Sequence, residues 1–168
     1  MNKKTMPYVA PVLFFLLLLV DGQISRLFGN VLQNRVMAIS SILLIALIPA
    51  TMKLSRRYLV ILMLILGILM DSYYLGVLGI NTLMLPLMTF YAYGSREVIN
   101  TNIFTELFGL IILITVYHSA LALLEALFGL AKVSVIEFIA QILGPTLILN
   151  IIFFFVLIVP FRRLFRIR

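Results

Sequence analysis

The feature that most constrains this chain is a series of six apolar runs, each close to the length that crosses a lipid bilayer. The runs occupy residues 7–28, 36–52, 58–75, 77–93, 103–128 and 133–159. A membrane-spanning helix needs about 20 predominantly apolar residues, so six of them use nearly all of the 168 residues. Backbone groups find no water in hydrocarbon, and runs such as residues 111–114 (IILI) lack the alternation of barrel strands. The runs therefore predict helices.

Composition excludes the other broad classes. The chain is 64% apolar and 11% charged, against about 45–50% and about 25% in soluble domains. Disorder needs low hydrophobicity, and the absence of cysteine excludes a disulfide scaffold, a Cys-ligated zinc site and a thiol nucleophile. We therefore expect an all-α integral membrane protein with a single domain over residues 1–168. Its predicted form is a compact bundle of six transmembrane helices, with five as the alternative count.

Basic residues predict the orientation, because cytoplasmic loops of membrane proteins are enriched in Lys and Arg. With six spans, 10 of the 13 basic residues fall on one side: Lys3, Lys4, Lys53, Arg56, Arg57, Arg96, Arg162, Arg163, Arg166 and Arg168. This split places both termini in the cytoplasm, with a basic tail at residues 160–168 that begins where Pro160 ends the last helix. The net charge of +7 then reflects the enrichment of Lys and Arg on the cytoplasmic side of the membrane. No arm is left to bind nucleic acid, and the tail either anchors the last span or lies on membrane lipid.

Polar residues within the predicted spans are few, and a charge at mid-bilayer costs at least about 2.5–3.5 kcal/mol. His118 and Glu125 are seven residues apart and share one helix face. That face could form a proton relay or a metal site, but the chain has one histidine and no cysteine. We interpret Asp21, His118 and Glu125 as structural contacts between helices, and we expect Glu106 to be solvated.

Motifs for chemistry are absent from the sequence. It contains no G-x-S-x-G elbow, H-E-x-x-H or phosphate-binding loop, which are the patterns that carry acyl transfer, zinc hydrolysis and nucleotide binding. We therefore predict no catalytic, cofactor-binding or metal-binding residues and no enzyme.

The most informative stretch is GILMDSYYLGVLGINTLMLP, residues 67–86. Gly67 permits close approach of two helices, and Gly76 and Gly79 tolerate the positive φ of a tight turn. Asp71 can accept hydrogen bonds from that turn or cap the helix that opens near Asn81. The stretch predicts a helical hairpin with a polar tip that protein shields from lipid.

The same stretch resembles the rod shape-determining protein MreD family, in the pattern G-x-x-x-D-x-x-x-x-G-x-x-G-[IL]-[NH]-[TA]-L. A second match lies in the last run, where Pro145, Thr146 and Asn150 form a P-T-x-x-x-N sequence before Pro160 and a basic end. The resemblance implies a protein without catalytic activity. It also implies a helix arrangement similar to the substrate-binding subunits of energy-coupling-factor (ECF) vitamin transporters.

The resemblance further implies partners. MreD-like proteins bind MreC, through its transmembrane helix and its extracytoplasmic domain, within the rod complex that also contains MreB, RodA and a class B penicillin-binding protein. The residues expected to shape such an interface are Gly67, Asp71, Gly76, Gly79, Asn81, Pro145 and Asn150. The alternative is an ECF-type substrate-binding subunit or other small-molecule carrier, which would need an outward polar pocket.

Overall fold

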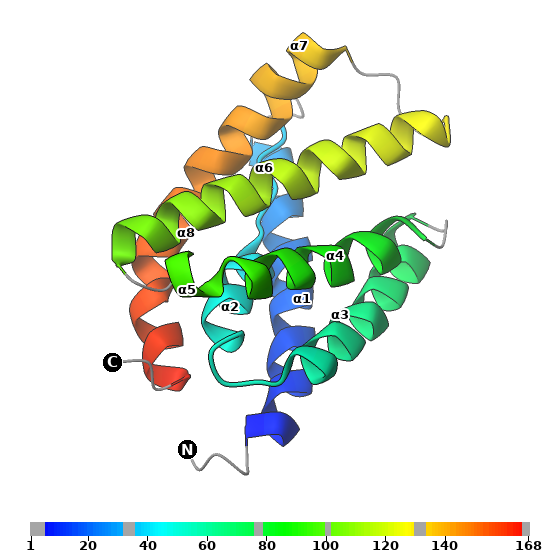
Figure 1. Ribbon diagram of the computed structural model, residues 1–168. Coiled ribbons are helices and arrows are strands. Elements are labelled where there is room, and N and C mark those ends of the chain that lie inside the picture. Colours follow the sequence, from blue (N-terminus) through cyan, green and yellow to red (C-terminus); the bar gives the residue numbers. More distant parts are fainter. Residues whose placement is uncertain (1–5, 32–35, 76–78, 100–101, 130–133, 166–168) are drawn as a thin grey trace.

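The described part of the chain is entirely helical outside its turns and one irregular segment. The computed structural model describes residues 6–31, 36–75, 79–99, 102–129 and 134–165. The elements are α1 (Met6–Val31), α2 (Ile42–Ala50), α3 (Arg56–Met70), the π-helical turn η1 (Asp71–Leu75), α4 (Ile80–Gly94), α5 (Arg96–Ile99), α6 (Ile103–Leu127), α7 (Val135–Glu137), the π-helical η2 (Phe138–Leu143) and α8 (Gly144–Leu164) (Figure 1).

Within the described residues, three helical segments are long and apolar enough to cross a membrane. They are Tyr8–Asn30, Ile103–Leu127 and Val135–Leu164. The start of α1, the start of α3 and the end of α8 lie in the lower half of Figure 1, whereas the end of α1, the end of α6 and α7 lie at the top. The protein therefore has the architecture of a multi-span helical membrane protein.

Helix α2 forms the centre of the core. All nine of its residues, Ile42–Ala50, are buried, and the helices that contact it are α1, α4, α6 and α8. Such a helix is too short to cross a membrane alone, because nine residues at 1.5 Å each span only about 14 Å. The surrounding helices instead enclose it completely, which explains why its sequence, ILLIALIPA, has no polar face.

The predicted second run differs most from the structure. A continuous helix was expected over residues 36–52, but Met37–Ser41 is irregular and the helix begins only at Ile42. The reason is that several backbone amides in Met37–Ser41 bond to neighbouring helices instead of to helical carbonyls. The expectation that Pro160 ends the last helix is also wrong, since α8 continues through Pro160 to Leu164.

Candidate functional site

Asp71 caps the N-terminus of α4. Its carboxylate accepts backbone N–H bonds from Gly79 (2.9 Å), Asn81 (2.8 Å) and Thr82 (2.9 Å). The side chains of Asn81 and Thr82 donate two further bonds, at 3.0 and 2.7 Å. An anionic acceptor at a helix N-terminus satisfies unpaired N–H groups and interacts favourably with the helix dipole. This arrangement explains how a fully buried carboxylate is tolerated.

Two glycines make this cap geometrically attainable. A Cβ on Gly67 would lie 2.6 Å from the carbonyl oxygen of Asn81 and 2.7 Å from the Cα of Thr82, so α3 and α4 touch backbone to backbone there. Gly79 has φ +123°, a conformation that other residues rarely adopt. Gly76, predicted to share the turn, lies outside the described residues.

Asn81 also joins the hairpin to α6. Its side-chain oxygen accepts a bond from the Tyr117 hydroxyl at 2.7 Å, and the ring of Tyr117 packs edge-on against that of His118, with centroids 5.1 Å apart. Asn81 therefore links the Asp71 cap to the centre of the bundle.

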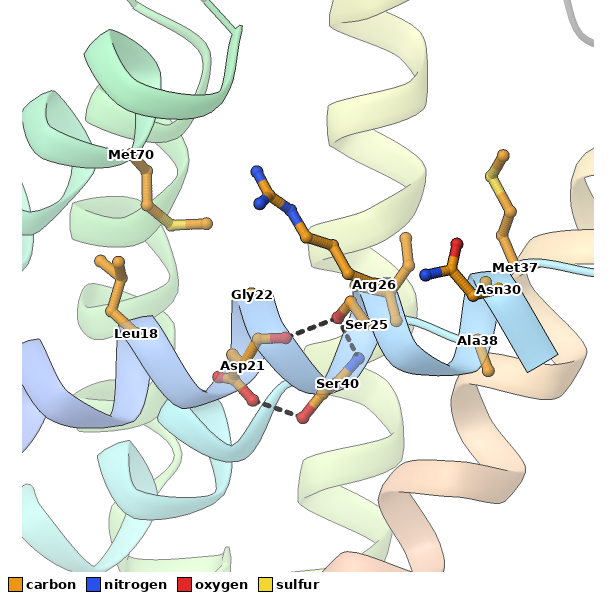
Figure 2. A pocket seen from close by; sticks show the side chains of 12 residues that line it. Leu18, Asp21, Gly22, Ser25, Arg26, Asn30, Met37, Ala38, Ser40 and Met70 are labelled. Atoms are coloured by element: carbon orange, nitrogen blue, oxygen red, sulfur yellow. Dashed lines mark hydrogen bonds between the residues drawn. The ribbon is translucent and has the colours of Figure 1, made fainter. Parts of the chain in front are cut away.

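A second carboxylate, that of Asp21 on α1, caps the N-terminus of α2. It accepts backbone N–H bonds from Ile42 (2.8 Å) and Leu43 (2.9 Å), and a bond from the Ser40 hydroxyl at 2.5 Å. Ser25, one turn further along α1, accepts from the Ser40 backbone N–H at 2.9 Å (Figure 2). One face of α1 thus holds the end of the irregular Met37–Ser41 segment.

The opposite side of Met37–Ser41 is held by the P-T-x-x-x-N sequence. Pro145 has no N–H to donate to the carbonyl of Gln141, four residues earlier, and that carbonyl accepts a bond from the Met37 N–H at 2.8 Å. The hydroxyl oxygen of Thr146 accepts from the Ile39 N–H at 3.0 Å. Pro145 thus leaves the Gln141 carbonyl free and Thr146 supplies its hydroxyl oxygen, and both acceptors bind the irregular Met37–Ser41 segment.

Asn150 completes this set of contacts with Met37–Ser41, which we call the polar clamp. Its Oδ1 accepts from the Ser41 N–H at 2.8 Å, and its Nδ2 donates to the carbonyls of Ile39 and Thr146, each at 2.8 Å. The Nε2 atom of His118, on α6, lies 3.0 Å from the Ser41 hydroxyl oxygen, within hydrogen-bond distance. Three helices thus bind the residues that precede α2.

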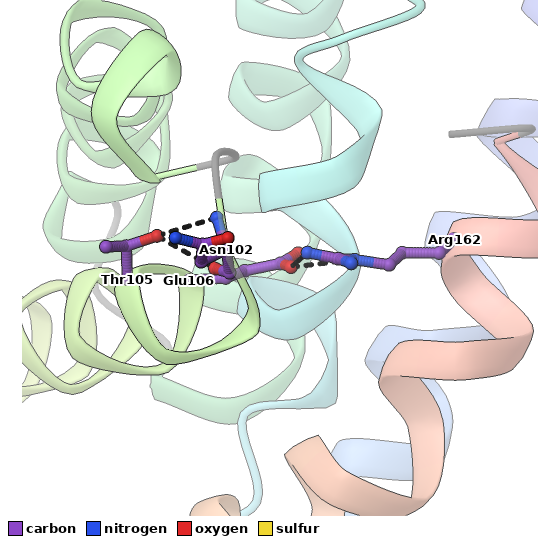
Figure 3. Close-up of polar contacts among 4 residues, drawn as sticks. All are labelled: Asn102, Thr105, Glu106 and Arg162. Atoms are coloured by element: carbon purple, nitrogen blue, oxygen red, sulfur yellow. Dashed lines mark hydrogen bonds and ion pairs between the residues drawn. The ribbon is translucent and has the colours of Figure 1, made fainter. Parts of the chain in front are cut away.

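An ion pair joins α6 to α8 at the other end of the bundle. Arg162 donates to Glu106 through Nε at 2.9 Å and through Nη2 (Figure 3). The Glu106 side chain is 1% exposed, so the expectation that it is solvated is wrong. The signal that could have predicted the pair is that both residues lie at the same end of adjacent predicted spans.

Cavities surround the Met37–Ser41 segment. One of about 500 Å³ lies between α1 and this segment, with Asp21, Ser25, Arg26 and Ser40 in its wall (Figure 2). Another, of about 280 Å³, is bordered by Ser41, His118 and Glu125 among others. Glu125 lies on α6 and is half-buried. Within the part of the chain that the structure describes, no group of three or more His, Cys, Asp or Glu side chains could hold a metal ion.

The serines are the site residues that the sequence analysis missed, and Thr146 was named in the P-T-x-x-x-N sequence but not among the expected interface residues. Ser40 and Ser41 interrupt an apolar run, and Thr146 follows Pro145, which is the available signal. Asp71, Asn81, Asn150, Asp21 and His118 all bond within the protein. The arrangement can hold helices at fixed positions, and within it the Ser41 hydroxyl and the His118 imidazole, 3.0 Å apart, join the start of α2 to α6.

Fold and site together define a multi-span membrane protein whose buried polar residues fix the packing of its helices. The family model for the rod shape-determining protein MreD matches residues 2–168, and the chain belongs to this family. The cell shape-determining protein MreD of Streptococcus pneumoniae (strain ATCC BAA-255 / R6) is similar, with 30% identity over 132 residues, covering 79% of this chain and 80% of that protein. No solved structure matches the chain. The chain is accordingly a non-catalytic cell shape-determining membrane protein.

Proposed function

We propose that the protein is a membrane scaffold of the cell-wall elongation machinery, which binds MreC through its transmembrane region and so helps to control cell shape and peptidoglycan synthesis. The observation that carries the proposal is the match of the family model to residues 2–168. MreB, RodA and a class B penicillin-binding protein are its indirect partners. In this role the chain packs its transmembrane helices against those of other membrane proteins.

The proposed setting is the bacterial cytoplasmic membrane, with six membrane segments and both termini in the cytoplasm. The basic residues support this orientation, since α3 begins at Arg56 and the last turn of α8 contains Arg162. The start of α3 and the end of α8 lie toward the same end as the start of α1 (Figure 1). A helix arrangement similar to that of ECF substrate-binding subunits is part of the proposal.

Apolar rows on the outside of the bundle are the surfaces available to a partner helix. On α6 the exposed row is Phe104, Phe108, Ile112 and Val116, and on α8 it is Ile148, Ile152, Phe155 and Val159. In each row the residues recur at the three- or four-residue spacing that defines one helix face. Association of helices in lipid depends on close packing of such faces. The polar clamp fixes the positions of the helices, and those positions determine the shape of the outer surface that a partner helix contacts.

Co-purification from bacterial membranes tests the proposal. We expect a tagged chain to recover MreC in mild detergent, and failure to recover it from membranes that contain both proteins would overturn the proposal. The chain has no cysteine, so a single cysteine placed at Phe108 or Ile152 is unique. Disulfide cross-linking to a cysteine in the MreC transmembrane helix then identifies the row that MreC contacts, and cysteine at the buried Leu110 is the matched control.

Measurements of cell shape and expression level in variants of Asp71 and Asn150 show whether these residues shape the partner interface or serve folding alone. We expect Asn150→Leu, expressed at the normal level, to change cell shape and to reduce the recovery of MreC. Loss of expression by itself would assign Asn150 to folding. The same comparison applies to Asp71→Asn.

The alternative function, a substrate-binding subunit of a transporter, is favoured by one observation. Cavities of about 500 and 280 Å³ border the Met37–Ser41 segment, a range in which small-molecule sites begin. Recovery of a vitamin-like ligand with the purified chain, together with an energy-coupling partner, would favour this alternative over the scaffold.

A further inference from the structure

Two cavities meet at one face of α6. The first, of about 280 Å³, and the second, of about 300 Å³, share four lining residues: Ile39, His118, Leu121 and Glu125. His118 and Glu125 are seven residues apart, which places them about 10 Å apart along the helix axis at 1.5 Å per residue. The walls between them are largely apolar, with Leu18, Met70, Leu85 and Ile142 among their residues.

His118 offers one group to these cavities. The side chain is 5% exposed, and one ring nitrogen bonds to Ser41 at 3.0 Å. The ring also lines both cavities. A neutral imidazole has one donor and one acceptor nitrogen, so the nitrogen that does not bond to Ser41 can bond to a ligand hydroxyl.

Glu125 offers a second group of different character. The side chain is half-buried, and its carboxylate forms no hydrogen bond or ion pair with any described residue. Asp21, which also lines the first cavity, is already bonded to three donors. Glu125 is therefore the carboxylate that remains to bind a cation, and burial makes an uncompensated carboxylate costly.

We propose that these two cavities bind a small amphipathic amine, with its ammonium group on Glu125 and a hydroxyl or similar neutral group on His118. The apolar walls between the two residues contact its hydrocarbon chain. A metal ion fits poorly, because no cluster of three ligating side chains occurs among the described residues. A two-chain lipid is too large for cavities of about 300 Å³, which lie at the small end of ligand sites. The inference does not rest on the proposed scaffold function.

Titration calorimetry of the full chain in detergent tests the site with 8-amino-1-octanol, whose extended length approximates the separation of the two groups. We expect binding at one site per chain, and binding of 1,8-octanediol, which lacks the ammonium group, that is at least tenfold weaker. Equal affinity for the two compounds would overturn the proposal, because partition into the micelle or an apolar cavity alone would then explain the heat.

Two variants locate the site. Glu125→Gln is expected to raise the Kd for 8-amino-1-octanol at least tenfold, whereas Glu97→Gln, an exposed acid on α5, is the matched control and leaves the Kd unchanged. Leu121→Trp fills the shared wall and is expected to abolish binding without removing a charge, and it introduces a fluorophore into a chain that has no tryptophan. Unchanged binding in both Glu125→Gln and Leu121→Trp would place the amine elsewhere. Neither outcome bears on recovery of MreC, so the two proposals fail separately.

Discussion

The two capped helix starts inside this bundle are chemically alike and topologically different. Asp71 caps α4 with donors only 8 to 11 residues away in the chain. Asp21 caps α2 from 19 to 22 residues away, and the same segment needs Asn150, which lies 109 residues from Ser41. The first cap forms within one hairpin, whereas the second requires that α1, α6 and α8 are already in place.

The two caps also differ in their surroundings. Asp71 is fully buried and accepts five hydrogen bonds. Asp21 is 8% exposed, accepts three, and borders a cavity of about 500 Å³. The wall of this cavity is largely apolar but includes Ser25, Arg26 and Ser40 beside Asp21, so it has room and polar partners for water, which can satisfy a group that loses its partner. The local cap should therefore be the more sensitive of the two to substitution.

Asp71→Asn is expected to have the largest effect. The amide NH₂ replaces one carboxylate oxygen and faces donors, so at least two buried donors lose their acceptor at about 1–3 kcal/mol each. We expect a loss of about 3–5 kcal/mol in the free energy of unfolding, measured by thermal unfolding of the purified chain in detergent. A smaller loss than that of Asp21→Asn would contradict the comparison.

Gly67→Ala tests the close contact that the local cap requires. The added methyl group would overlap the backbone of Asn81 and Thr82, which cannot move away as a flexible side chain can. We expect a loss of about 2–3 kcal/mol, typical of overpacking in a dense core. Gly94→Ala is the matched control, since a Cβ there meets nothing within 4 Å. Because Ala favours a helix more than Gly does, only the contact makes Gly67→Ala costly, and equal losses in the two variants would contradict that explanation.

Asp21→Asn sharpens the contrast. Asn retains one acceptor oxygen, which can keep the bonds to Ser40 and Ile42, and only the Leu43 N–H is left unpaired. Because water can enter the adjoining cavity, we expect a loss of about 1–2 kcal/mol, at the low end for an unsatisfied buried group. The same unfolding measurement checks it. A loss above that of Asp71→Asn would mean that the cavity is dry.

Pro145→Ala is expected to have the smallest effect on stability, within about 1 kcal/mol. The new N–H can bond to the Gln141 carbonyl and compete with the Met37 N–H. The helix then gains one hydrogen bond and the Met37–Ser41 segment loses one. Hydrogen exchange should become faster at Met37–Ser41, and Pro160→Ala, remote from that segment on the same helix, should leave exchange there unchanged. Unaltered exchange in Pro145→Ala would show that the Gln141 contact does not hold the segment.

Local sequence signals predicted the hairpin well. Gly67, Asp71 and Gly79 lie in one short stretch, and the cap, the close approach and the positive φ all follow from properties of those residue types. The P-T-x-x-x-N sequence was recognised but its contacts were not. Nothing in the spacing of Pro145, Thr146 and Asn150 shows that their acceptors serve a segment more than 100 residues earlier.

Hydropathy alone determined that this is a helical membrane protein, because long apolar runs have one stable arrangement in lipid. Only the tertiary structure decided that residues 36–52 hold an irregular segment and a buried nine-residue helix. The physical reason is that an apolar run of that length suits both a lipid-facing helix and a central one. The choice depends on whether side chains from distant helices can satisfy its backbone, which Asp21, Ser25, Thr146 and Asn150 do here.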